Sequence, residues 1–99
     1  MQFMITAYEG TDSEAMERRM KARSLHLANI TKVKDGKVVC AGGILNEEGK
    51  MKGSFLIMDF PSREAFDAYL STEPYNTGGV WKDIKVETCH VAIMNDEPV

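Results

Sequence analysis

Residues 53–60 constrain the fold more than any other stretch, because they are apolar at nearly every position: Gly53-Ser54-Phe55-Leu56-Ile57-Met58-Asp59-Phe60. A strand with one face in water alternates apolar and polar side chains, and this stretch does not. It therefore predicts a strand covered on both faces. Residues 2–8 give the same indication, since Phe3, Ile5 and Ala7 share one face and Met4, Thr6 and Tyr8 share the other.

Two segments have helical periodicity. The first begins with a predicted capping box from Thr11 to Glu14 and runs to about Lys34, where Asp35-Gly36 ends it. At about 100° per residue, its packed face comprises Met16, Met20, Leu27 and Ile30.

The second helix is predicted to start after a Ser62 cap and to end at residues 71–74, because a residue before proline is driven out of helical geometry. Its packed face comprises Ala65, Phe66, Tyr69 and Leu70.

The remaining segments complete a βαββαβ order. Residues 37–41 read as the second strand, 75–82 as a loop, 84–93 as a last strand with a change of phase, and 95–99 as a loose tail. The order predicts one α+β domain over residues 1–99 with a ferredoxin-like antiparallel sheet.

Two helices cover only one face of such a sheet, so we expect a homodimer whose sheets meet face to face as a dimeric α+β barrel. The pattern leaves open whether residues 55 and 57 or residues 56 and 58 face the partner.

Composition excludes several classes of function. A net charge of -3 offers no basic surface for nucleic acid. No apolar run reaches the roughly 20 residues of a membrane span, and the N-terminus lacks a signal-peptide pattern, so we expect a cytoplasmic chain without a membrane partner. In that compartment Cys40 and Cys89 are expected to be buried, reduced thiols. The His and carboxylate residues show no metal-ligand spacing.

The side chains best suited to bind a ligand or transfer a proton lie late in the first predicted helix. Arg19, Arg23 and His26 stand at i, i+4 and i+7 and form one stripe, with Arg23 near the centre of the apolar arc. A guanidinium there needs an anion, which the chain supplies as Glu73 or Asp59, or which a small anionic or phenolic ligand supplies.

His26 is either a packed structural histidine or half of an acid–base dyad with Glu73, which would orient one ring nitrogen. Tyr75 and Trp81 either line an aromatic ligand pocket or pack at the dimer interface.

The chain resembles the YciI family, whose domain is called YCII-related. The motifs that carry this resemblance are Phe3-Met4-Ile5, Arg23-x-x-His26-Leu27, Asp35-Gly36 with Val38 and Ala41-Gly42, Phe60-x-Ser62-x-Glu64-Ala65, Pro74-Tyr75 and Gly79-Val80. The resemblance implies a dimeric ferredoxin-like α+β barrel with a His–Asp dyad in a cleft that takes small hydroxylated aromatics. His26 matches the family histidine, Glu73 stands where the family usually has aspartate, and Gly43 replaces a common proline.

Three functions remain open at this level. The first is an enzyme without cofactor or metal, of lyase, isomerase or dehalogenase type, in which His26 and Glu73 are catalytic and Arg23, Arg19, Tyr75 and Trp81 bind substrate. The second is a module that binds a small metabolite without turnover. The third is a dimeric scaffold, because this architecture hosts many functions.

Overall fold

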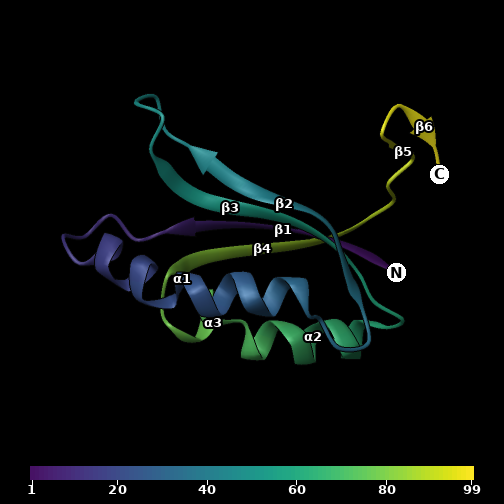
Figure 1. The fold of residues 1–99 in the computed structure, drawn as a ribbon, viewed down its shortest axis with the longest axis horizontal. Coiled ribbons are helices and arrows are strands. Elements are labelled where there is room, and N and C mark those ends of the chain that lie inside the picture. The colour runs from purple at the N-terminus through teal and green to yellow at the C-terminus, as the bar shows by residue number, and fades with distance from the viewer.

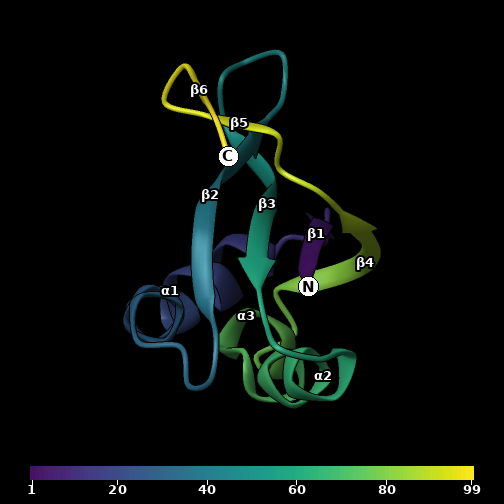
Figure 2. The same cartoon turned by 90° about the vertical axis from the view of Figure 1, so that its right-hand side faces the viewer.

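The chain alternates strands and helices, and the computed structural model describes all residues 1–99 (Figure 1). The elements are β1 Gln2–Glu9, α1 Ala15–Thr31, β2 Lys37–Leu45, β3 Met51–Asp59, α2 Arg63–Thr72, α3 Pro74–Thr77, β4 Trp81–Cys89, β5 Ile93–Met94 and β6 Glu97–Pro98. The first four long strands form an antiparallel sheet in the order β2-β3-β1-β4. Figures 1 and 2 show the three helices on one side of this sheet, which confirms the ferredoxin-like α+β prediction.

The core lies between the sheet and the helices. Its inward side chains alternate along the central strands: Phe3, Ile5 and Ala7 of β1, and Leu56 and Met58 of β3. Phe66 of α2 packs on them, with its ring stacked on Phe3 at 4.4 Å between centroids. Residues 56 and 58 therefore face the helices.

The opposite sheet face has no helix over it. Phe55 is exposed there and Ile57 is only half-buried, and both pair across the ladder with β1 residues of the same parity, Thr6 and Met4. The parity that the sequence left open is settled: residues 55 and 57 face away from the helices. We call this surface, made of Met4, Thr6, Tyr8, Phe55 and Ile57, the open face.

Three of the four residues predicted for the packing face of the first helix are wrong, and only Ile30 is confirmed. Ala22, His26 and Ile30 are its buried residues, whereas Met16, Met20 and Leu27 are exposed. The buried stripe is rotated by roughly a quarter turn from the predicted one, taking 100° per residue. The small side chain of Ala22 lies close to Gly78, the residue directly after α3. Helix α1 therefore packs against α3 as well as against the sheet.

The helix ends also differ from the predictions. No capping box forms at Thr11 and Glu14. Instead the Asp12 carboxylate accepts from the Glu14 backbone N–H at 3.3 Å and binds Arg18 through two hydrogen bonds. The helix then ends at Thr31 rather than Lys34. The Ser62 cap is confirmed, because its hydroxyl accepts from the Ala65 N–H at 3.1 Å.

The C-terminal third departs furthest from the predictions. Residues 75–82 are not a loop, since α3 occupies Pro74–Thr77 and β4 starts at Trp81. The last strand ends at Cys89, and the tail forms the β5–β6 hairpin. Cys40 and Cys89 are free on opposite edges of the sheet, but neither is buried as predicted, since Cys40 is exposed and Cys89 is half-buried.

Candidate functional site

Glu73 occupies the junction between α2 and α3, and its side chain is completely buried. Pro74 drives this residue into extended geometry, with φ -63° and ψ 123°, so the chain breaks helical continuity here. Glu73 consequently ends one helix and caps the next, and its carboxylate accepts from the Tyr75 backbone N–H at 3.1 Å. The turn aims the carboxylate toward α1.

Both oxygens of Glu73 are fully used. Oε1 accepts from His26 Nδ1 and from the Tyr75 N–H, and Oε2 accepts from the Tyr69 hydroxyl at 2.8 Å and from Asn29 Nδ2 at 3.1 Å. Burial acts to raise the pKa of Glu73, but the hydrogen bonds from His26, the Tyr75 N–H and the Tyr69 hydroxyl outweigh it and lower the pKa. The carboxylate is therefore ionised, and the same carboxylate together with burial raises the pKa of the Tyr69 phenol.

His26 is held on three sides. Its Nδ1 lies on Glu73, so the carboxylate sets the tautomer with the proton on Nδ1 and leaves Nε2 with its lone pair. The Tyr75 ring stacks on the imidazole with centroids 3.8 Å apart and planes 4° apart, and the Trp81 ring meets it edge-on at 5.9 Å. The imidazole orientation is thus fixed before any ligand arrives.

His26 opens into a cleft of about 190 Å³ between α1 and the β2–β3 hairpin. Its walls include two arginines of α1, the glycine pair of β2 and a hydroxyl of β3: Arg19, Arg23, His26, Leu27, Ile30, Ala41, Gly42, Gly43, Met51, Ser54, Phe55, Leu56 and Tyr75. Gly43 shapes the rim, because a Cβ there would lie 2.0 Å from the Met51 methyl group. We call this the histidine cleft.

The two arginines play different parts in the cleft. Arg23 is exposed and forms no ion pair, so the alternative in which it pairs with Glu73 or Asp59 is wrong, and the alternative of a ligand anion stays a prediction. Arg19 is mostly buried and lies 3.4 Å from the Glu9 carboxylate, measured from Nε to Oε2. Both atoms are buried and neither makes a hydrogen bond, so Arg19 is held beside Glu9 by charge alone.

Two acidic groups beside the arginines have raised pKa values. Burial raises the pKa of Glu9, although the Arg19 guanidinium opposes that shift. Burial likewise raises the pKa of the Tyr75 phenol against the opposing charge of Arg19. Tyr75 therefore remains a protonated hydrogen-bond donor at neutral pH.

Trp81 stands behind the cleft rather than in its wall. Its Nε1 donates to the Ser54 hydroxyl at 3.2 Å, and both residues are buried. Ser54 lines the cleft, and with its oxygen accepting from Trp81 its own proton is free to point at a ligand. Tyr75 does line the cleft, whereas Trp81 acts on it through Ser54, Tyr75 and His26.

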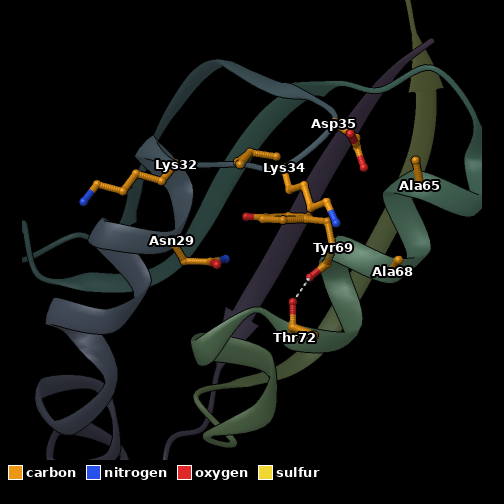
Figure 3. A pocket seen from close by; sticks show the side chains of 9 residues that line it. Asn29, Lys32, Lys34, Asp35, Ala65, Ala68, Tyr69 and Thr72 are labelled. Carbon is orange, nitrogen blue, oxygen red and sulfur yellow. Dashed lines mark hydrogen bonds between the residues drawn. The ribbon is translucent and has the colours of Figure 1, made fainter.

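A second pocket of about 300 Å³ lies on the other side of Glu73, between the end of α1 and α2 (Figure 3). Its wall contains Asn29 and Tyr69, the two residues that bond Glu73 Oε2. Figure 3 shows the Tyr69 ring at its centre with the Lys34 side chain beside it. Of these two pockets, only the histidine cleft is lined by a histidine, the residue type best suited to acid–base chemistry, so it is the candidate functional site.

Three residues of the site were not predicted from the sequence: Tyr69, Asn29 and Glu9. Tyr69 was assigned only to the packed side of its helix, but it lies four residues before Glu73 on that helix, where its hydroxyl meets the carboxylate. Asn29 follows His26 by three positions and so shares its helix face. Glu9 continues the inward parity of Phe3, Ile5 and Ala7.

Two further observations bear on the class of protein. None of the helices combines the length and apolarity needed to span a bilayer. No group of three or more His, Cys, Asp or Glu side chains is placed to hold a metal ion.

Fold and site define an α+β ferredoxin-like protein with a small cleft beside a carboxylate-bound histidine. Residues 1–90 match the YCII-related domain, and the chain belongs to that family. It is 32% identical to Protein YciI of Escherichia coli O6:H1 and equally to that of Shigella flexneri, over 94 residues that cover 88% of this chain and 94% of each relative.

Among solved structures, the chain is similar to 5-chloro-2-hydroxyhydroquinone dehydrochlorinase (TftG) from Burkholderia phenoliruptrix AC1100, in complex with 2,5-dihydroxybenzoquinone. The TM-score is 0.76 at 23% identity, covering 91% of this chain and 94% of that one. A dimeric ferredoxin-like protein of unknown function from Jannaschia sp. CCS1 matches with a TM-score of 0.56 at 16% identity, covering 91% and 98%. These two likenesses concern the fold.

Proposed function

We propose that this protein is a small cofactor-independent enzyme that moves a proton on a small hydroxylated aromatic or anionic substrate, with His26 as the acid–base group and Glu73 as its partner. One observation carries the proposal: the imidazole opens into the histidine cleft while a fully buried, ionised carboxylate holds its other face. A positioned base of this kind contributes about 10²–10⁴-fold to a rate.

In this mechanism Nε2 of His26 takes a proton from a ring hydroxyl or an acidic carbon of the substrate. The imidazolium that forms is stabilised by Glu73, which stays ionised because four donors hold it. The same Nε2–H then returns the proton to the product or to a departing group, which completes an isomerisation or an elimination.

The charges of the cleft support a substrate that carries negative charge on oxygen. Arg23 forms no ion pair and Arg19 also lines the cleft, so their positive charges favour a phenolate or carboxylate there. The hydroxyls of Tyr75 and Ser54 are further donors. The similar dehydrochlorinase holds 2,5-dihydroxybenzoquinone, a small hydroxylated ring compound, and this supports the same class of substrate here.

The proposed assembly is a homodimer joined through the open face. Phe55 and Ile57 remain uncovered on that face of the chain, and apolar strand faces of this kind need a second layer. The dimeric ferredoxin-like protein from Jannaschia sp. CCS1, which is similar in fold, supports the expectation of a dimer. Ile57→Glu should weaken the dimer, and light scattering across micromolar concentrations measures its mass.

The test is a screen of hydroxylated benzenes and benzoquinones, starting with 2,5-dihydroxybenzoquinone as ligand. Turnover that falls by about 10²-fold or more in a folded His26→Ala variant supports the enzyme. Arg23→Ala should raise KM more than it lowers kcat, because this arginine binds rather than reacts. Saturable binding without turnover assigns the cleft to a metabolite-binding module, and absence of binding contradicts both.

A further inference from the structure

The C-terminal arm, residues 91–99, is an ordered hairpin rather than a loose tail. Ile93 pairs with Pro98 and Met94 with Glu97, and the Val99 N–H donates to the Ala92 carbonyl at 2.9 Å. The two connecting residues have left-handed backbones, Asn95 with φ 53° and Asp96 with φ 65°. Positive φ at both central positions defines a type I′ turn, which favours a tight hairpin.

The arm exposes apolar side chains that this chain does not cover. Ile93 is 67% exposed and Val99 is 65% exposed. An isolated two-stranded hairpin is marginally stable in water and needs packing against another layer. This hairpin has only two residues in each strand, so it has few backbone hydrogen bonds and little packing of its own to stabilise it. Its apolar groups require a surface outside its own domain.

The direction of the arm indicates which surface that is. As the chain leaves β4, the Val91 N–H donates to Gln2 Oε1 at 2.7 Å, and Gln2 shares the parity of the open face. Figures 1 and 2 both show the arm rising from the side of the sheet opposite the helices. The match to the shared family domain ends at residue 90, so the arm lies beyond it.

We propose that the C-terminal arm is a clasp that packs Ile93 and Val99 against a second copy of this chain, beside the open face. The inference rests on the dimer proposed above, because only a face-to-face partner lies on that side of the sheet. In the dimer each arm extends the contact past the edge of the paired sheets, and apolar groups that are bare in one chain become buried.

Charges placed in the C-terminal arm of the chain of residues 1–99 test the clasp. The double variant Ile93→Asp/Val99→Asp should raise the dimer dissociation constant at least about tenfold, since burying even one such aliphatic side chain is worth that much. Leu25→Asp is the matched control, because Leu25 is 64% exposed on the helix layer. Sedimentation velocity over a dilution series measures all three proteins, and circular dichroism checks their folding.

A second measurement needs no variant. In a dimer mixed from isotope-labelled and unlabelled wild-type chains, isotope-filtered NOEs should connect the Ile93 methyl groups to the other chain. A wild-type chain that is monomeric throughout would overturn both the dimer and the clasp. A wild-type dimer with no such NOEs, and with the same dissociation constant in the double variant, would overturn the clasp alone.

Discussion

Two buried carboxylates flank the same histidine cleft and behave in opposite ways. Glu73 accepts four hydrogen bonds, and its pKa is lowered. Glu9 faces Arg19 at 3.4 Å without a hydrogen bond at the nearest oxygen, and its pKa is raised by burial. Burial alone therefore does not decide the charge of a site carboxylate. The number and geometry of donors decide it.

The largest expected contrast between the two carboxylates is in stability. Glu73→Gln places an amide among four donors and removes the charge opposite His26, so it should lower the free energy of unfolding by about 3 kcal/mol. Glu9→Gln removes a charge that burial penalises and should change it by less than about 1 kcal/mol. Urea denaturation of both variants checks this. Equal losses in the two variants would contradict the contrast.

The second expected difference between Glu73 and Glu9 is in how each affects the pH dependence of stability. The pKa of Glu73 is lowered on folding, so its contribution is complete above the unfolded value of about 4.5 and is lost as pH falls below it. Wild-type stability should then fall with a slope approaching about 1.4 kcal/mol per pH unit for that one proton. Glu73→Gln should remove this part of the acid slope.

The contribution of Glu9 to stability should change with pH in the opposite direction. Its pKa is raised on folding, so its contribution is present below about 4.5 and is lost as pH rises through the folded value. Glu9→Gln should therefore benefit stability most above that range. A Glu9→Gln curve parallel to wild type from pH 3 to 7 would contradict the raised pKa.

A smaller loss of stability is expected when a single hydrogen-bond donor to Glu73 is removed. Tyr69→Phe removes the hydroxyl that donates to Glu73 Oε2 and should cost about 1 kcal/mol. In a Glu73→Gln background the same Tyr69→Phe change should cost less, because the charged acceptor of the hydroxyl is gone. Thermal unfolding in both backgrounds measures the difference. An equal cost in both would show that Tyr69 contributes nothing through Glu73.

Much of the fold follows from the sequence because it depends on local periodicity. The apolar runs at residues 2–8 and 53–60 predict the two central strands, and the Ser62 cap predicts the start of α2. The rotation of α1 does not follow, because Ala22 and His26 face inward only once α3 and Glu73 are in place. A polar residue in a buried stripe is invisible to hydrophobic periodicity.

The candidate site, like the fold, follows from the sequence only in part. The sequence leaves open whether His26 is a packed structural residue or the partner of Glu73, and the structure joins the two side chains through a hydrogen bond. Arg23 was expected at the centre of the packed face, yet it is exposed at the cleft. Glu9 depends on tertiary geometry, since the register of β1 against β4 shifts between Tyr8 and Glu9 and brings Glu9 beside Trp81.

The tautomer of His26 tests whether Glu73 prepares the histidine for proton transfer. In the neutral imidazole, ¹⁵N NMR should find the proton on Nδ1, with a strongly deshielded Nδ1–H in its hydrogen bond to Glu73 and the lone pair on Nε2. In Glu73→Gln that deshielded proton should disappear while the fold persists. A wild-type imidazole with its proton on Nε2, or an unchanged spectrum in Glu73→Gln, would contradict the proposal.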